Sequence, residues 1–512
     1  MVRGRFMFVA LLGVALGLVG IMALLNPDLP APGTANGLRD QDAAVRPESR
    51  SELGPLSDAP RYQLEAIIDP ESGQFSGRMT LDYTNTAQEE LDSLVFRLYP
   101  QAASIYGGGE LEVSLVRQGE SSLQPLPSSD PTILAVPLAR PLGPGESVSL
   151  QLEFTGQAPS GSRQGYGIFG RSSGLLALAG WYPLLAPYQG GWQTPEVPIV
   201  GDALQAETAF FSASLTLPAG YELATGGSVV STATLTATLA SPPAGASDPE
   251  AWRTWRVLSG PARELAVVAG RDFELHSREI DGILLRMFTR TGAEGSLQPE
   301  LGLDLAAGNL RAFEARFGPY PFTELDIVES PITIDGYEFS GLVIVDPGLR
   351  SGGSQADYEY ILAHEIAHQW WYGLAGNRTV EEPWLDEAHA SYAAILYLEH
   401  AGRPESAAQL LSRWENTVSR LSDPAPVDSS ALEFENWNAY RDVVYLRGAL
   451  FIHSLRQELG EEAFFRLLQR YQEEARYRIG STELYLQLAE ETAGRELDDF
   501  LQQWINGGRP GA

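Results

Sequence analysis

The spacing of apolar residues changes near residue 278, and this change constrains the fold more than any other feature of the sequence. Before it, apolar residues alternate with polar ones, as Met79, Leu81 and Tyr83 do. A period of two is typical of strands that are buried on one face, and short turns rich in Gly and Pro separate the segments. We therefore predict an antiparallel β domain over residues 61–278.

Beyond residue 278 the apolar residues recur with the spacing of helices. Pro299–Phe317 and Glu462–Arg476 show this spacing, whereas Leu325–Val328 and Leu342–Val345 have the composition of short strands. Such a mixture predicts an α+β unit that ends in helices over residues 279–512. The chain as a whole is therefore expected to be α+β, with the β domain first and a mainly helical domain second.

The N-terminus contains an uncharged, mainly apolar run of 20 residues, Phe6–Leu25, which is long enough to cross a bilayer as a helix. Residues 1–25 are predicted to be a membrane anchor or a signal segment, and the length of the run favours the anchor. Arg3 and Arg5 precede the run, so the positive-inside rule places the rest of the chain outside the cytoplasm. We expect a membrane-anchored, extracytoplasmic protein, or a secreted one if the segment is cleaved.

Residues 26–60 are rich in Pro, Ala, Asp, Arg and Ser, and their prolines interrupt any regular element. This composition predicts a flexible linker between the N-terminal segment and the β domain.

Charge and composition exclude several classes of protein. The 35 basic and 66 acidic side chains give a net charge of −31, a field that repels nucleic acid, so no nucleic-acid partner is expected. The sequence contains neither cysteine nor lysine. This excludes thiolate zinc sites, thiol nucleophiles, lysine Schiff bases and P-loop lysines. Carboxylate, histidine, hydroxyl and metal chemistry remain, with six histidines to serve it.

The segment His364–His368 has the sequence HEIAH inside a stretch with helical spacing. Residues at i and i+4 lie on one helix face, so both imidazoles can reach one zinc ion while Glu365 flanks a water on the metal. A catalytic zinc has three protein ligands and an open position. Glu387, near the start of the next apolar helix, is the candidate third ligand. We expect one Zn²⁺ per chain.

HEIAHQWW, with 18 residues between its second histidine and the Glu of WLDEA, resembles the gluzincin aminopeptidases typified by aminopeptidase N, peptidase family M1. The resemblance implies a thermolysin-like catalytic domain, peptide substrates, and zinc bound by His364, His368 and Glu387. It implies a metallopeptidase in which zinc polarises the scissile carbonyl. Glu365 takes the proton of the attacking water and returns it to the leaving amine.

Two further segments support the resemblance. ITIDGYEFSGLVIVD is similar to the exopeptidase loop of the family, usually Gly-x-Met-Glu-Asn, which implies that Glu338 binds the free α-amine of the substrate and that Gly336 belongs to the same substrate-binding loop. VVYLRGALFIHSLRQELG resembles the Tyr-x-Lys-Gly stretch of the family. This second likeness implies that Tyr445 donates a hydrogen bond to the oxyanion, a role worth roughly 3 to 4 kcal/mol for a single donor.

The sequence also departs from the family pattern. Asp335, Tyr337 and Phe339 stand where Gly, Met and Asn are common, and Arg447 replaces the usual Lys. The large helical C-terminal domain of many relatives does not follow residue 508, so we expect a wider cleft. An endopeptidase with the same zinc site is therefore one alternative. A non-catalytic, membrane-tethered binding protein with a structural zinc is another, although a structural site needs no base such as Glu365.

Overall fold

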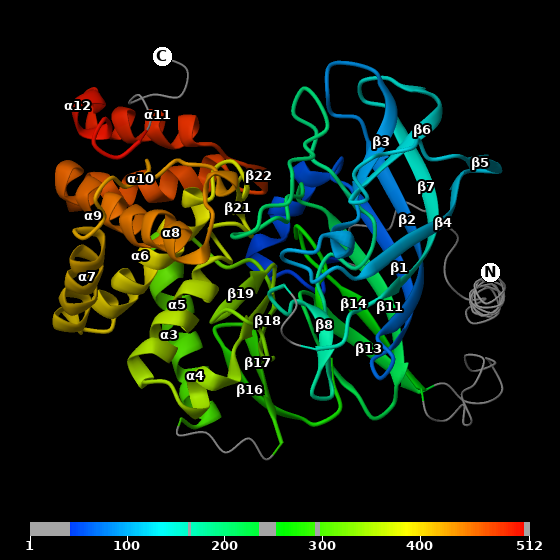
Figure 1. Cartoon of the computed structure of the whole chain (residues 1–512), viewed down its shortest axis with the longest axis horizontal. Coiled ribbons are helices and arrows are strands. Elements are labelled where there is room, and N and C mark those ends of the chain that lie inside the picture. Colours follow the sequence, from blue (N-terminus) through cyan, green and yellow to red (C-terminus); the bar gives the residue numbers. More distant parts are fainter. Residues whose placement is uncertain (1–40, 162–164, 235–251, 292–296, 506–512) are drawn as a thin grey trace.

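The computed structural model describes residues 41–161, 165–234, 252–291 and 297–505, and it divides them into a sheet-rich half and a helical half (Figure 1). The α+β fold class predicted from the sequence is confirmed. The predicted N-terminal anchor and the first part of the predicted linker lie outside the described residues. A search of the described ranges finds no helix with both the length and the apolar character needed to cross a bilayer.

An eight-stranded sheet forms the body of the first half, in the order β13-β14-β11-β1-β2-β7-β4-β5. Its strands are β1 (Arg61–Asp69), β2 (Gln74–Thr84), β4 (Glu110–Gln118), β5 (Ser121–Leu123), β7 (Ser147–Gln157), β11 (Phe210–Pro218), β13 (Ser228–Thr234) and β14 (Trp252–Leu258). Met79, Leu81 and Tyr83 are buried, as their alternation predicts. The strand pairs are antiparallel except that β1 and β11 run parallel. Turn signals between neighbouring strands do not reveal this exception, because it joins segments far apart in the chain.

Two smaller sheets complete this half, in the orders β10-β3-β6 and β12-β15-β9-β8. Their strands are β3 (Leu91–Arg97), β6 (Ile133–Leu142), β8 (Phe169–Ser172), β9 (Leu175–Leu178), β10 (Leu184–Leu185), β12 (Glu222–Thr225) and β15 (Val267–Gly270), and the short 3-10 helix η2 (Tyr99–Gln101) follows β3. Apolar side chains from all three sheets share one hydrophobic core. Burial of apolar area in this core is the main stabilising contribution to the first half.

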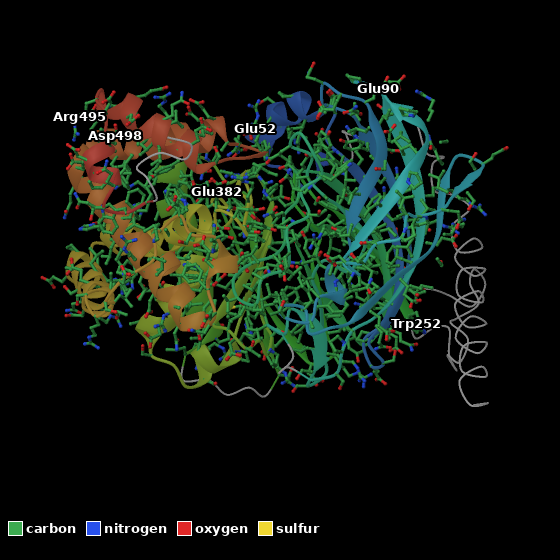
Figure 2. The ribbon with its side chains drawn as sticks, turned by 45° about the horizontal axis from the view of Figure 1, so that its top comes forward. Glu52, Glu90, Trp252, Glu382, Arg495 and Asp498 are labelled. Carbon is green, nitrogen blue, oxygen red and sulfur yellow. The ribbon has the colours of Figure 1, made fainter. Side chains whose placement is uncertain are left out.

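The flexible linker predicted for residues 26–60 is wrong for residues 41–60, which pack on the folded body. The 3-10 helix η1 (Pro47–Leu56) buries Leu53 in a small cluster with Val45 and Phe210. On the other side of η1, Glu52 accepts a hydrogen bond of 2.6 Å from Arg476 and lies where the two halves meet (Figure 2). A few apolar side chains are enough to dock this segment, and its overall composition conceals them.

A five-stranded sheet, in the order β16-β17-β18-β20-β19, begins the second half. Its strands are β16 (Phe273–Ile280), β17 (Ile283–Arg290), β18 (Glu324–Glu329), β19 (Gly336–Phe339) and β20 (Leu342–Val345). The predicted domain boundary at residues 278 and 279 falls inside β16, which pairs along its whole length with β17. The predicted boundary therefore lies a few residues beyond the start of the five-stranded sheet at Phe273. The alternating pattern continues from one sheet into the next, so the sequence contains no marker of the change.

Helices form the rest of the second half. They are α3 (Pro299–Phe317), α4 (Pro347–Ser351), α5 (Gln355–Ala367), α6 (Trp384–His400), α7 (Pro404–Val418), η4 (Ala431–Glu433), α8 (Trp437–Tyr440), η5 (Arg441–Arg447), α9 (Gly448–Leu459), α10 (Glu461–Glu474), α11 (Thr482–Ala493) and α12 (Asp498–Leu501), with a two-residue strand pair of β21 (Ala375–Gly376) and β22 (Arg478–Ile479). Helices α3 and α5 contact the five-stranded sheet, and α6 packs on α5 and α9. These contacts bury a second hydrophobic core.

Buried polar contacts join the two halves immediately behind the HEIAH helix. The fully buried guanidinium of Arg263 donates hydrogen bonds to the carbonyl oxygens of Ala206, Tyr372 and Arg478. Glu264, the next residue, accepts a hydrogen bond from the hydroxyl of Tyr372. Because these bonds connect the β domain to the chain that follows α5, they hold the two walls of the cleft in a fixed relation.

Candidate functional site

Helices α5 and α6 bring two histidines and a carboxylate together. His364 lies in the last turn of α5 and His368 follows as its C-cap residue, with their Nε2 atoms 3.1 Å apart. Glu387 comes from the first turn of α6, and its Oε2 lies 3.1 Å from Nε2 of His364 and 3.5 Å from Nε2 of His368. All three side chains are buried. The three residues predicted as metal ligands therefore converge on one point.

The spacing of these three atoms fits a zinc ion. Ligand atoms at the corners of a tetrahedron, each about 2.0 to 2.1 Å from the metal, are about 3.3 to 3.4 Å apart. The observed separations of 3.1 to 3.5 Å bracket this value. Two imidazoles and one carboxylate are also a donor set that catalytic zinc sites use. The residues present thus match the metal in both geometry and chemistry.

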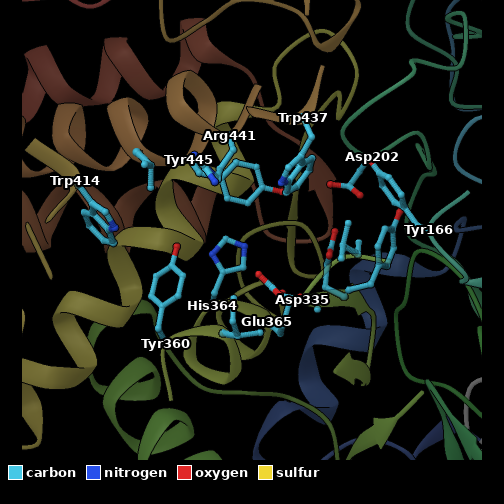
Figure 3. Close-up of a pocket in the computed structure, with 16 residues that line it drawn as sticks. Tyr166, Asp202, Asp335, Tyr360, His364, Glu365, Trp414, Trp437, Arg441 and Tyr445 are labelled. Atoms are coloured by element: carbon cyan, nitrogen blue, oxygen red, sulfur yellow. The ribbon is translucent and has the colours of Figure 1, made fainter. Parts of the chain in front are cut away.

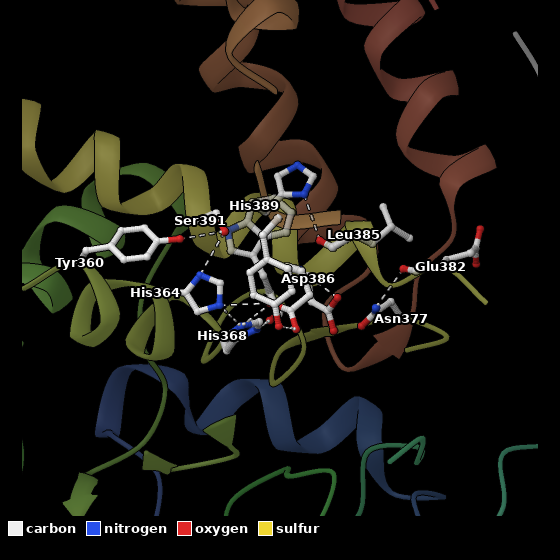
Figure 4. Close-up of polar contacts among 12 residues, drawn as sticks. Tyr360, His364, His368, Asn377, Glu382, Leu385, Asp386, His389 and Ser391 are labelled. Carbon is white, nitrogen blue, oxygen red and sulfur yellow. Dashed lines mark hydrogen bonds and ion pairs between the residues drawn. The ribbon is translucent and has the colours of Figure 1, made fainter. Parts of the chain in front are cut away.

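A second layer of contacts orients the imidazoles (Figure 4). Nδ1 of His368 donates to the carbonyl of Trp371 at 3.0 Å, and Nδ1 of His364 shares a hydrogen bond of 3.3 Å with the hydroxyl of Ser391. The same hydroxyl accepts a hydrogen bond of 3.4 Å from Tyr360. Because Nδ1 of each ring is hydrogen-bonded away from the cleft, Nε2 is the ring nitrogen that faces the metal position.

Glu365 is 4% exposed, and in the described part of the chain its Oε2 has no hydrogen-bond partner. Gly336 on β19 lies against this side chain, since a Cβ at that position would come within 2.3 Å of Oε1. Any larger residue at position 336 would therefore clash with the carboxylate of Glu365. Burial raises the pKa of Glu365 to about 8, with His368 opposing the shift and Glu387 adding to it. A carboxyl group that titrates near neutral pH is suited to proton transfer.

Mutual interactions shift the pKa values of the predicted metal ligands. Burial alone would raise the pKa of Glu387, but hydrogen bonds from His364 and His368 lower it well below its usual range. Although burial opposes it, the hydrogen bond with Glu387 raises the pKa of His368 to about 9. Glu387 therefore favours a positive charge on His368, whereas burial lowers the pKa of His364. A divalent cation bound between the three side chains would supply that positive charge instead.

Tyr445 comes from η5, a single π-helical segment, and such turns are frequent at functional sites. Its hydroxyl donates to Oε1 of Glu387 at 2.6 Å, and its ring stacks on His364 at 5.4 Å between centroids. Tyr440, one turn earlier, buries a hydroxyl that has no partner among the described residues. The structure thus brings Tyr445 to the metal position and leaves Tyr440 as a packing residue behind it.

Two buried carboxylates form the acidic end of the cleft, which we define by Glu338 and Asp202. Glu338 on β19 is 5% exposed and Asp202, from the β domain, is 7% exposed. Burial raises the pKa of Glu338 well above its usual range, and Asp202 and Glu387 add to the shift. Burial and Glu387 raise the pKa of Asp202 in the same way. Among the described residues, no arginine forms an ion pair with either carboxylate, so this end of the cleft attracts a cation from outside.

Sequence reasoning missed Asp202 and its neighbour Tyr166. Gly201 adopts a φ of +85°, and its N–H donates to the hydroxyl of Tyr166 at 2.8 Å. A Cβ on Gly201 would lie 2.6 Å from the hydroxyl of Tyr440, so the close approach requires glycine. The Gly-Asp pair stands in a segment with no periodicity, and nothing in the sequence connects it with a strand more than a hundred positions later.

The cleft extends from this acidic end, past the metal position, to a second end on α5 and α7 (Figure 3). Asp202 and Tyr166 lie at one side, His364 and Glu365 between, and Tyr360 with Trp414 at the other. Its lining is Tyr166, Asp202, Ile334, Asp335, Gly336, Tyr337, Glu338, Tyr360, Ile361, His364, Glu365, Trp414, Trp437, Arg441, Tyr445 and Leu446.

Other residues singled out in the sequence serve the fold. Of the three departures in the exopeptidase loop, Phe339 is 1% exposed and packs in the core beneath β19, whereas Asp335 and Tyr337 line the cleft beside Glu338. Arg447 donates to the carbonyls of Ala425, Gln503 and Trp504, and thus ties the C-terminal helices to η5. The loop therefore keeps Glu338 in the cleft despite its altered neighbours.

Comparisons with known proteins agree with this geometry. Residues 302–504 match the peptidase family M1 domain. Aminopeptidase M1-B of Oryza sativa subsp. japonica is 28% identical over 262 residues, which are 47% of this chain and 29% of that protein. Aminopeptidase N of Streptomyces lividans is 27% identical over 261 residues, 47% of this chain and 30% of that protein. The matched segment thus spans less than a third of the full length of these curated relatives.

A solved structure matches nearly the whole fold. The crystal structure of an M1 zinc metallopeptidase from Deinococcus radiodurans superposes with a TM-score of 0.67 and 22% identity, and covers 89% of this chain and 95% of that one. The match includes both halves, so their arrangement is shared with that protein.

Proposed function

Because this chain belongs to peptidase family M1, the gluzincin aminopeptidases, we propose that it is a zinc-dependent aminopeptidase that removes N-terminal residues from peptides. The observation that carries the proposal is the convergence of His364, His368 and Glu387 beside Glu365, in a cleft with a buried acidic end. The activity follows from what each part of that cleft offers to a peptide.

The acidic end favours a substrate with a free α-amine. Glu338 and Asp202 are both buried, and burial together with repulsion from Asp202 raises the pKa of Glu338. A substrate ammonium placed between them would relieve this repulsion and accept charge-assisted hydrogen bonds. An acetylated N-terminus offers no charge and leaves both carboxylates unpaired. Glu338 and Asp202 therefore select the first residue of a peptide by its amine.

His364, His368 and Glu387 would hold one zinc ion per chain. Zinc bound there supplies Lewis acidity, which polarises a carbonyl and lowers the pKa of a water molecule. Glu365, with one carboxylate oxygen free, accepts the proton of the attacking water and passes it to the nitrogen of the leaving amine. The hydroxyl of Tyr445 donates a hydrogen bond to the oxygen on which negative charge develops.

The altered exopeptidase loop does not favour the endopeptidase alternative. Phe339 lies in the core, and although Asp335 and Tyr337 line the cleft, Glu338 stays buried as a carboxylate of the same cleft. Glu365 beside the metal position likewise weighs against a binding protein with a structural zinc, since such a site needs no free carboxylate. A Deinococcus radiodurans M1 zinc metallopeptidase crystallised with a Tyr-Ser-Ala substrate supports peptides as the substrate class.

The test compares one peptide with a free and with an acetylated N-terminus, using zinc-loaded protein. We expect cleavage of the free form only, lost in Glu365→Gln and after removal of zinc by a chelator. Glu338→Gln and Asp202→Asn should raise KM for the free peptide and reduce its advantage over the acetylated one. Equal cleavage of both forms by the unaltered protein would establish an endopeptidase instead. Bound zinc without any cleavage would favour the binding protein.

The N-terminal segment supports a further part of this proposal. We propose that Phe6–Leu25 anchors the protein in a membrane with the catalytic part outside the cytoplasm. Membrane fractionation of cells that express the full chain, combined with protease accessibility, tests this. Release of the protein into the medium with a new N-terminus would show a cleaved signal instead.

A further inference from the structure

We propose that the aromatic end of the cleft, defined by Tyr360, Trp414 and Leu446, receives the side chain of the second residue of the substrate and selects large apolar residues there. This inference rests on the proposed aminopeptidase function. It names a specificity for the residue whose amine leaves, and it follows from the order of side chains along the cleft.

A continuous series of ring contacts establishes that order. From the acidic end, Tyr166 contacts Trp437 at 6.4 Å between centroids, and Trp437 contacts Tyr445 at 5.6 Å. Tyr445 stacks on the metal-position residue His364 at 5.4 Å. The metal position therefore lies in the middle of the series, and Trp437 lies on its acidic side.

The series continues on the other side of the metal position. His364 contacts Tyr360 at 6.1 Å, and Tyr360 contacts Trp414 at 6.1 Å. Figure 3 shows the same order, with Trp414 and Tyr360 on the side of His364 that is away from Asp202. A peptide whose ammonium is held at the acidic end must therefore continue past His364 toward Tyr360 and Trp414.

Only one residue of the substrate lies between the amine and the scissile carbonyl in an aminopeptidase reaction. Once that carbonyl is at the metal position, the next side chain is the first to pass His364. The second residue of the substrate thus meets the aromatic end, while the first residue meets the wall that Trp437 contributes.

The chemistry of the aromatic end suits an apolar side chain. Trp414 is 5% exposed and packs against Tyr360, whose hydroxyl is already bonded to Ser391. Leu446 is half-buried on η5, which packs against α7. Arg441, a cation that lines the same cleft, is bonded to the carboxylate of Asp442 beside it. An acidic second residue would therefore lose water without gaining a cationic partner.

The test measures kcat/KM for release of the first residue from Ala-Phe-Ala, Ala-Ala-Ala and Ala-Asp-Ala. Burial of a phenylalanine side chain corresponds to roughly tenfold or more in preference, so we expect Ala-Phe-Ala to exceed Ala-Ala-Ala by about that factor. Ala-Asp-Ala should be the poorest of the three. Trp414→Ala should reduce the preference for Phe over Ala to about twofold or less.

Trp437→Ala is the matched control, since it removes a tryptophan from the same cleft on the other side of the metal position. It should change the ratio between Phe-Ala-Ala and Ala-Ala-Ala but leave the second-residue ratio intact. Ratios are used because a general loss of activity cancels in them. Thermal unfolding of each variant shows whether it is folded.

Leu446→Glu keeps the test open if Trp414→Ala does not fold, because Leu446 is only half-buried. It should reverse the preference, so that Ala-Arg-Ala becomes better than Ala-Phe-Ala. A second-residue ratio near one in the unaltered protein, or a ratio that neither variant changes, would overturn the specificity while aminopeptidase activity stands. If zinc-loaded protein cleaves none of the free tripeptides, the proposed aminopeptidase function itself is contradicted.

Discussion

The core beneath the large sheet and the walls of the cleft bury different kinds of side chain. In the β domain, the buried side chains beneath the large sheet are apolar, as Met79, Leu150 and Trp181 illustrate. Around the cleft, carboxylates are buried instead, each less than a tenth exposed: Asp202, Glu338, Glu365, Asp386 and Glu387. Burial of charge costs free energy, and packing elsewhere in the chain must offset that cost. Stability therefore depends mainly on the buried apolar residues, whereas function depends on the buried carboxylates of the cleft.

The largest expected effect is that of Glu365→Gln on the rate. Loss of a positioned base costs about 10²- to 10⁴-fold in rate. We expect kcat to decrease by a factor in the upper part of that range, with zinc still bound. Because burial raises the pKa of Glu365 to about 8, its ionised form opposes folding at pH 7, and the amide should leave stability equal or higher in metal-free protein. Steady-state kinetics, zinc analysis and urea unfolding check this. Substantial activity in the variant would assign the proton transfer to another group.

Trp181→Ala tests the opposite side of the comparison. Trp181 is fully buried, packs against Phe75 and Phe154, and donates from its indole to the carbonyl of Leu265 at 2.9 Å. Its truncation should lower the free energy of unfolding by about 3 to 5 kcal/mol, because a cavity and an unpaired carbonyl remain. The kcat/KM of the folded fraction should be unchanged. A fall in that value would show that the core of the β domain also shapes the cleft.

Tyr445→Phe should have a smaller effect on the rate than loss of the base. Removal of one oxyanion donor costs about 10²- to 10³-fold in kcat, with KM nearly unchanged, because the bond is formed in the transition state. Tyr440→Phe is the matched control, since the hydroxyl of Tyr440 has no partner among the described residues and its ring contacts Tyr445 at 5.8 Å. Similar losses in both variants would show that removal of either buried hydroxyl lowers the rate, and would contradict a specific oxyanion role for Tyr445.

The difference between local and long-range contacts explains which features of the fold could be predicted from the sequence. Alternation placed strands such as β2 and β7 because burial on one face imposes a period of two. Helix α3 was predicted with the bounds that the structure has, since Pro299 and Gly318 flank it. The parallel pairing of β1 with β11 and the docking of residues 41–60 depend on contacts between distant segments. Local patterns contain no information on such contacts.

The candidate site divides in the same way. His364 and His368 could be paired from spacing because one helix turn sets their separation, and Glu387 was named with them as the third ligand. Asp202 could not be found, because it reaches Glu338 only through the packing of the β domain against β19. Local geometry therefore identifies a metal site in a sequence, whereas the binding surface around it depends on tertiary structure.

The smallest predicted effect concerns His389, which lies beside the metal ligands but is buried as a core residue. Its ring stacks on Trp371 at 3.9 Å between centroids, and its Nδ1 donates to the carbonyl of Leu385 at 3.0 Å. Burial lowers the pKa of His389 to about 3, whereas an unfolded histidine titrates near 6.5. As pH falls below about 6.5, His389 therefore becomes protonated in the unfolded state but stays neutral in the folded state. The contribution of His389 to stability is complete above that pH and is lost as pH falls toward 3.

His389→Phe retains the stacked ring and removes this titration. Between pH 7.5 and pH 5 the unaltered protein should lose about 2 kcal/mol more of its free energy of unfolding than the variant does. The buried carboxylates of the cleft titrate in both proteins, so their contribution cancels in the difference. Urea unfolding at the two pH values measures it. Identical pH dependence in both proteins would mean that His389 accepts a proton in the folded state, and that a charged group is tolerated in the core behind the metal site.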